Sequence, residues 1–303
     1  MAVVNLLFAL SVALTTAALP SPSPAPVDAR DLISIPDALT TAPWYGAPEN
    51  NFSCSSTTHP NPVVLLHGLS ADDQVDLNLL QIYLNKLDFC TFSLTYGAHT
   101  LAPWIGGLKP LADSAVEIAD FVREVLDKTG ASKVDLVGHS EGGVQALYVP
   151  RSQPGISDVV EHLVALGPAM HGAEYYGFTD LWYIGGNVTR DAVALVLKTV
   201  GCAGCDDLAV GGETTKELND GNPVVQPGNK ATIIMSTNDK LVPPEKSIVD
   251  EEGVRNILVQ DTCPEDQLGH AGLAWDTGVW GLIVNALTED YDAPVTCDTG
   301  LTF

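Results

Sequence analysis

The stretch that decides the fold is Val134–Gly143, VDLVGHSEGG, a short apolar run that ends in a G-x-S-x-G sequence. Residues 134–137 have the composition of a buried strand, and residues 144–148 that of a helix starting directly after the glycines. Ser140 would then lie on a sharp strand-to-helix turn, the setting of a nucleophile elbow. A side chain at Gly138 or Gly142 would collide with the neighbouring strand or helix, so the turn requires these glycines. An ordinary turn of small residues has the same pattern, and the partners of the serine decide between the two.

A serine hydroxyl near neutral pH needs a base, and the base needs an acid that fixes its tautomer. With this kind of elbow, the acid and then the base follow the serine along the chain, each after a strand. Residues 231–235 are strand-like, and the loop after them carries Asp239. Residues 256–260 are also strand-like, and His270 follows them. Of the seven histidines only His270 has the required order, so Ser140, Asp239 and His270 form the candidate catalytic set.

Six short motifs occur in order along the chain: PVVLLHG at 62–68, KVDLVGHS at 133–140, GCAGC at 201–205, Asn238-Asp239, QDTCP at 260–264 and GHAGL at 269–273. Together they resemble the secreted class 2 lipases of the α/β-hydrolase superfamily, which occur in bacteria and fungi. The resemblance covers about residues 62 to 297, and it is strongest to the disulfide-bearing branch. It implies an α/β-hydrolase fold, with a mostly parallel sheet, helices on both faces and a cap insertion. It also implies esterase or triacylglycerol lipase activity, and no cofactor is expected.

The resemblance implies specific roles for residues of this chain. Ser140, Asp239 and His270 would be the triad, and the backbone N–H groups of Leu69 and Glu141 would form the oxyanion hole. Loss of one such donor typically costs about 3 kcal/mol of transition-state stabilisation. One departure is Glu141, where Gln or Met is more familiar in the family. We expect the side chain at 141 to border the acyl pocket and to affect substrate preference.

The first residues have the features of a targeting segment. Residues 1–18 are apolar and end in small residues, which predicts a secretory signal peptide, although no Lys or Arg precedes Arg30. The apolar segment is too short to span a bilayer comfortably, so we expect secretion and no transmembrane anchor. Residues 19–43 are rich in Pro, Ser and Ala, typical of a leader or propeptide. Residues 44–303 then form one hydrolase domain.

The chain is strongly acidic, with 38 acidic and 14 basic residues and a net charge of −24. This balance argues against nucleic acid and anionic membranes as partners. The partner that we expect is a lipid or ester substrate, including one presented at a lipid–water interface. The oligomeric state does not follow from the sequence.

Six cysteines in a chain with a signal peptide favour disulfides over free thiols or a metal site. Spacing and the family resemblance together favour the pairs Cys54–Cys90, Cys202–Cys205 and Cys263–Cys297. A zinc site at the second pair would need two more ligands nearby, so no metal is expected. Asn51 and Asn187 begin glycosylation sequons, which matter in a eukaryotic host.

A long insertion separates two of the expected strands. Roughly 60 residues lie between the strand at 163–166 and the strand at 231–235, too many for a simple connection. The insertion holds aromatic residues at 175–184 and a helical apolar stripe at 193–200. We interpret residues 171–230 as a cap or lid, the alternative being an ordinary excursion with its own small core.

These features predict a secreted serine hydrolase of carboxylic esters, with triacylglycerol lipase as the first candidate. Short-chain carboxylesterase and cutinase-like polyester hydrolase are the enzymatic alternatives. A catalytically silent binding protein with a hydrolase fold is the alternative from another class. Such silent relatives usually lack a triad residue, whereas all three candidates occur here in order.

Overall fold

The computed structural model describes residues 46–173 and 187–297, and six parallel strands form its sheet in the order β2-β1-β3-β4-β5-β6. Every residue of β1 and β3, in the middle of the sheet, is buried. Such unbroken burial is expected for parallel strands that are covered on both faces. The strands are β1 Val63–Leu66, β2 Thr91–Ser93, β3 Val134–His139, β4 Val160–Leu166, β5 Lys230–Met235 and β6 Arg255–Leu258.

The strands predicted from the sequence are present, with bounds that differ by one to a few residues, and one of them is shorter than expected. β6 ends at Leu258, because the chain turns there into the helix α12, Val259–Thr262. His270, the candidate base, therefore follows a strand, one short helix and a loop. It still comes after Asp239, the candidate acid, along the chain.

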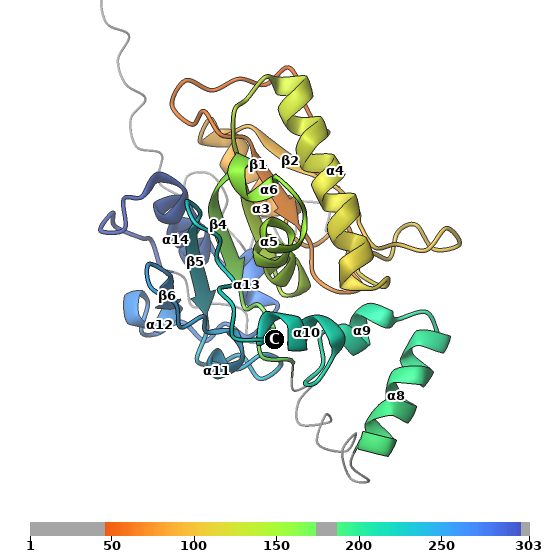
Figure 1. The fold of residues 1–303 in the computed structure, drawn as a ribbon. Helices are drawn as coiled ribbons and strands as arrows, with labels where there is room; N and C mark the ends of the chain where they lie inside the picture. The colour runs from red at the N-terminus through yellow and green to blue at the C-terminus, as the bar shows by residue number, and fades with distance from the viewer. Residues whose placement is uncertain (1–45, 174–186, 298–303) are drawn as a thin grey trace, which may run out of the picture.

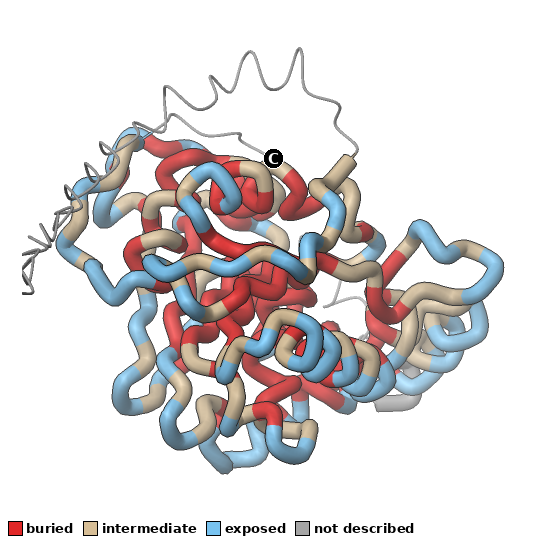
Figure 2. The backbone as a smooth tube through the Cα atoms, turned by 90° about the horizontal axis from the view of Figure 1, so that it is seen from above, coloured by how far each residue is buried: buried red, intermediate tan, exposed pale blue. Residues whose placement is uncertain are grey.

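Helices cover both faces of the sheet, as Figure 1 shows. α4 Leu111–Thr129, α5 Glu141–Ser152 and α6 Ile156–Val159 pack on one face, and their buried side chains share one core cluster. α3 Asn78–Lys86, α13 Gly272–Trp275 and α14 Thr277–Thr288 pack on the other face in a second cluster. In Figure 2 the buried segments occupy the centre and the exposed turns surround them. The predicted arrangement of layers is confirmed.

The three disulfides pair as expected: Cys54–Cys90, Cys202–Cys205 and Cys263–Cys297. The first connects the segment before β1 to the start of β2. The third connects the loop before His270 to the segment after α14.

The region between β4 and β5 includes α8 Asn187–Thr199, α9 Ala203–Asp207 and α10 Glu213–Leu218. Figure 1 shows them at the carboxyl end of the strands, with α10 toward α11 Pro244–Ser247 and α8 farthest from it. The N–H of Leu111, at the start of α4, donates to the Asp207 carboxylate at 2.9 Å. The N–H of Gly204 donates to the Leu108 carbonyl at 3.1 Å. These contacts attach α9 to the body of the domain.

Some sequence predictions lie outside the described residues. They are the signal peptide at 1–18, the leader at 19–43 and the whole aromatic segment at 175–184. The side chain of Asn187 is also outside, whereas the Asn51 side chain is exposed. Within the described ranges, no helix combines the length and apolar content needed to cross a bilayer.

Candidate active site

Ser140 occupies the turn between β3 and α5 in a strained backbone conformation. Its φ is +56°, uncommon for a residue with a side chain, and such a conformation costs about 1–3 kcal/mol. The Ser140 N–H donates to the Leu166 carbonyl at 2.8 Å, which holds the turn against β4. A Cβ at Gly138 would collide with the Gly142 carbonyl, and one at Gly142 with the Leu66 carbonyl. The glycines therefore allow a turn that directs the serine out of the sheet.

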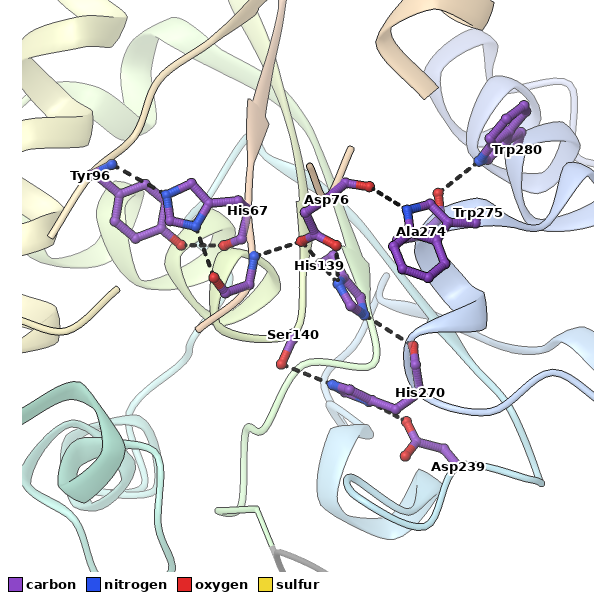
Figure 3. A network of polar contacts seen from close by, with 11 residues as sticks. His67, Asp76, Tyr96, His139, Ser140, Asp239, His270, Ala274, Trp275 and Trp280 are labelled. Atoms are coloured by element: carbon purple, nitrogen blue, oxygen red, sulfur yellow. Dashed lines mark hydrogen bonds and ion pairs between the residues drawn. The ribbon is translucent and has the colours of Figure 1, made fainter. Parts of the chain in front are cut away.

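The structure brings the three predicted residues into one line of hydrogen bonds (Figure 3). Ser140 Oγ lies 2.9 Å from Nε2 of His270, and Nδ1 of His270 lies 2.6 Å from Oδ2 of Asp239. The other oxygen of Asp239 accepts the N–H groups of Leu241 and Val242 at 2.9 and 2.8 Å. The carboxylate is thus fixed by its own loop. Because it accepts from Nδ1, Nε2 of His270 is left to accept the serine proton.

Burial lowers the pKa of His270, since the interior disfavours the charged ring. The hydrogen bond to Asp239 acts in the opposite direction, and the nearby His139 lowers the pKa further. The imidazole can act as a base only when it is neutral. Because the pKa of His270 is lowered, the ring stays neutral at pH values below the ordinary pKa of histidine.

A small cavity of about 180 Å³ lies beside Ser140. Its lining includes Gly68, Leu69, Ala71, Asp76, His139, Ser140, Ala169, Ala173, Leu208, Leu241, Val242 and His270. Leu69 thus lies at the cavity, where the sequence predicted one oxyanion donor. Glu141 is the first residue of α5, where a backbone N–H has no acceptor within the helix. Two larger cavities, of about 690 and 790 Å³, are lined mainly by polar and charged residues and include neither Ser140 nor His270.

The side chain of Glu141 does not border this cavity, so the expectation for position 141 is wrong. It is fully buried on the side of Gly107, where a Cβ would collide with the Glu141 carboxyl. Within residues 46–173 and 187–297 neither carboxyl oxygen has a hydrogen-bond partner. Burial raises the pKa of Glu141 well above its usual value, and the Asp207 carboxylate raises it further. The side chain points inward because α5 starts immediately after the strained turn.

The raised pKa makes the stability of the folded chain depend on pH at this position. The folded state keeps the Glu141 proton, whereas the unfolded chain releases it near the ordinary value of about 4.3. The resulting stability is present below that value and is lost as pH rises toward the pKa of the folded state. We expect Glu141→Gln, which does not titrate, to melt at a progressively higher temperature than the wild type between about pH 5 and pH 8. Melting temperatures by calorimetry check this, and parallel curves for the two proteins would contradict it.

Sequence analysis missed a second set of buried polar residues beside the first. Asp76, just before α3, accepts the N–H of Gly68 at 2.6 Å and contacts Nδ1 of His139 at 3.0 Å. Nε2 of His139 lies 3.0 Å from the carbonyl oxygen of His270 (Figure 3). The one sequence signal for this set is the position of His139 directly before the serine.

In the described part of the chain one cluster, Glu161, His162 and Glu289, has ligand atoms close enough for a metal ion. The Lys230 ammonium bonds to Glu161 at 3.0 Å and to Glu289 at 2.5 Å. The two carboxylates thus already have a cationic partner from the chain itself. The cluster lies near the amino end of β4, away from Ser140.

A parallel sheet covered on both faces, with a serine at the elbow after a central strand, defines an α/β-hydrolase fold. Residues 60–176 match the family described as Lipase (class 2). The crystal structure of Aspergillus fumigatus lipase B is similar in fold, with a TM-score of 0.57 and 18% sequence identity over 93% of this chain and 63% of that one.

Two triacylglycerol lipases share part of the sequence. The one from Pseudarthrobacter phenanthrenivorans is 28% identical over 128 residues, which are 39% of this chain and 36% of that protein. The one from Burkholderia plantarii is 28% identical over 128 residues, or 39% and 32% of the two chains. The chain thus matches about a third of the length of each relative.

Proposed function

We propose that the protein is a secreted serine hydrolase of carboxylic esters, and specifically a triacylglycerol lipase. The observation that carries this proposal is the line from Ser140 through His270 to Asp239, at 2.9 and 2.6 Å, on a strained elbow. The family match and the two related lipases support the same chemistry.

In the proposed reaction the Ser140 hydroxyl attacks the ester carbonyl, while Nε2 of His270 takes its proton. The Asp239 carboxylate keeps Nδ1 protonated and stabilises the imidazolium that forms. His270 then gives the proton to the leaving alcohol, and an acyl group remains on Ser140. Water, activated by the same imidazole, releases the acid and restores the serine.

The negative charge of each tetrahedral intermediate needs fixed donors. We assign this role to the backbone N–H groups of Leu69 and Glu141. Leu69 lies at the cavity beside Ser140, and Glu141 begins α5. The helix N-terminus adds a favourable partial positive charge at this point.

The proposed organisation keeps the signal peptide at 1–18, the leader at 19–43 and a domain at 44–303 whose residues 171–230 form a cap. Three disulfides are the expected feature of a protein that folds in an oxidising compartment. Leu208, the residue after α9, lines the cavity beside Ser140, which supports a cap over the substrate. Asn51, exposed before β1, is accessible for a glycan if the host is a eukaryote.

A second candidate is a short-chain carboxylesterase, which the small cavity of about 180 Å³ favours. Rates on p-nitrophenyl esters from acetate to palmitate, with emulsified triglyceride alongside, separate the candidates. A lipase should cleave the palmitate ester and the emulsion. Confinement of activity to the shortest esters would identify the carboxylesterase. If every ester stays intact with folded protein, the proposal fails in favour of a silent binding protein.

A further inference from the structure

The hydrogen bonds of two buried histidines near Ser140 determine different protonation states. Nδ1 of His67 faces the Gly68 carbonyl at 2.8 Å, and Nε2 of His67 accepts the N–H of Tyr96 at 3.3 Å. With one acceptor and one donor as partners, the His67 ring is neutral and carries its proton on Nδ1.

The two ring nitrogens of His139, in contrast, both face acceptors. Nδ1 lies 3.0 Å from the Asp76 carboxylate, and Nε2 lies 3.0 Å from the carbonyl oxygen of His270. Burial acts to raise the pKa of Asp76, but its contacts with His139 and the Gly68 N–H outweigh burial and lower that pKa, so the carboxyl is ionised. A carbonyl and an ionised carboxylate can only accept, so both ring nitrogens carry hydrogen and the ring is an imidazolium. Asp76 and His139 are both more than nine-tenths buried. In such surroundings a charged side chain requires an opposite charge in direct contact.

We propose that Asp76 and His139 form a buried carboxylate–imidazolium pair that positions the oxyanion loop and the base loop relative to Ser140. The kinetic role of this pair rests on the proposed function. Its charge state does not, because it can be measured without any substrate. Neither residue touches the reacting atoms, so both are positioning residues.

The geometry connects three loops through one carboxylate. Asp76 accepts the N–H of Gly68 at 2.6 Å and so fixes the backbone immediately before Leu69, the assigned oxyanion donor. Through His139, the residue before Ser140, it reaches the backbone of His270. The backbone carbonyl of Asp76 also accepts the indole N–H of Trp275 at 2.9 Å, which fixes α13 just beyond the base. An error of about 1 Å in such a constellation can cost roughly a hundredfold in rate.

The charge on His139 also acts on the base directly. The rings of His139 and His270 are 5.0 Å apart, centre to centre. The titratable groups that influence His270 are Asp239, His139 and Asp76, and the cation of His139 has a larger influence than the more remote Asp76. A fixed positive charge disfavours a second one, so His139 lowers the pKa of His270 and extends the neutral base to more acidic pH.

The substitution Asp76→Asn removes the charge of the carboxylate but keeps the number of hydrogen bonds. The amide oxygen can still accept from Gly68, and the amide N–H can donate to Nδ1 of a neutral His139, which keeps its bond to His270. We expect kcat to fall about tenfold with little change in KM. Because the cation is lost, the acid limb of the kcat/KM profile should move to higher pH. The substitution His139→Asn, which breaks the connection itself, should lower kcat about a hundredfold.

The matched control is another buried His–Asp pair at the opposite end of β3. Nδ1 of His162 lies 2.9 Å from Asp135, and both residues are more than nine-tenths buried. Asp135→Asn should destabilise the fold while leaving kcat and the acid limb unchanged. Equal kinetic effects in the Asp76 and Asp135 variants would overturn the proposal, because both losses would then reflect stability alone.

A second measurement tests the pair in the intact wild-type protein. Long-range ¹H–¹⁵N spectra should show His139 with two protonated nitrogens at pH 7.5 and His67 with one. A neutral His139 at that pH would overturn the inference even if esters are hydrolysed. If no ester is hydrolysed but His139 is an imidazolium, the proposed function fails while the pair itself is upheld.

Discussion

Replacement of Ser140 by alanine is expected to lower kcat/KM for ester hydrolysis by at least about 10⁴-fold, because the attacking oxygen is removed. The fold should remain, because no other hydrogen bond in the described structure depends on Oγ beyond the one with His270. The measurement is hydrolysis of the best p-nitrophenyl ester, with a circular dichroism melt of both proteins.

The control for this substitution is Ser114→Ala on α4, which removes a fully buried hydroxyl that has no hydrogen-bond partner among the described residues. It should keep nearly full activity. If Ser140→Ala retained more than about a hundredth of the wild-type rate while folded, the hydrolysis would have to proceed through another group.

Replacement of Asp239 by asparagine is expected to lower kcat about 10⁴-fold, because the amide would hold His270 in the wrong tautomer. In the folded protein the lost contact is the 2.6 Å bond between Oδ2 and Nδ1 of His270. The matched substitution is Asp266→Asn, a fully buried carboxylate only four residues from the base along the chain. Asp266 accepts the Leu268 N–H at 3.0 Å. The Asp266→Asn variant should be less stable than the wild type, but its kcat should fall less than about tenfold. If Asp266→Asn lowered kcat more than Asp239→Asn, Asp266 would be the catalytic acid instead of Asp239.

The positions of the strands along the chain and the elbow could be predicted because each depends on local patterns. Short apolar runs that end in glycine or polar residues indicated the strands, and G-x-S-x-G directly after one of them indicated the turn. The order of serine, acid and base along the chain then selected His270 from seven histidines. The disulfide pairs followed from spacing together with the family resemblance.

The direction of the Glu141 side chain could not be predicted. The spacing of apolar residues predicts which side of a helix is buried, but it does not predict how the helix is rotated at its start. In α5 that rotation depends on the strained turn at Ser140, so the direction of the Glu141 side chain does too. The Asp76–His139 pair was missed for a different reason. Its partners are 63 residues apart in sequence, and nothing local distinguishes a buried aspartate from the other acidic residues of so acidic a chain.

The most direct test of the central claim is covalent labelling of the native protein with a fluorophosphonate, followed by peptide mass spectrometry. The proposed chemistry requires that Ser140 alone becomes modified, and that Asp239→Asn and His139→Asn slow the modification in the same order as they lower kcat. Modification of another serine, or no modification of folded protein that hydrolyses esters, would contradict the assignment of Ser140 as the nucleophile.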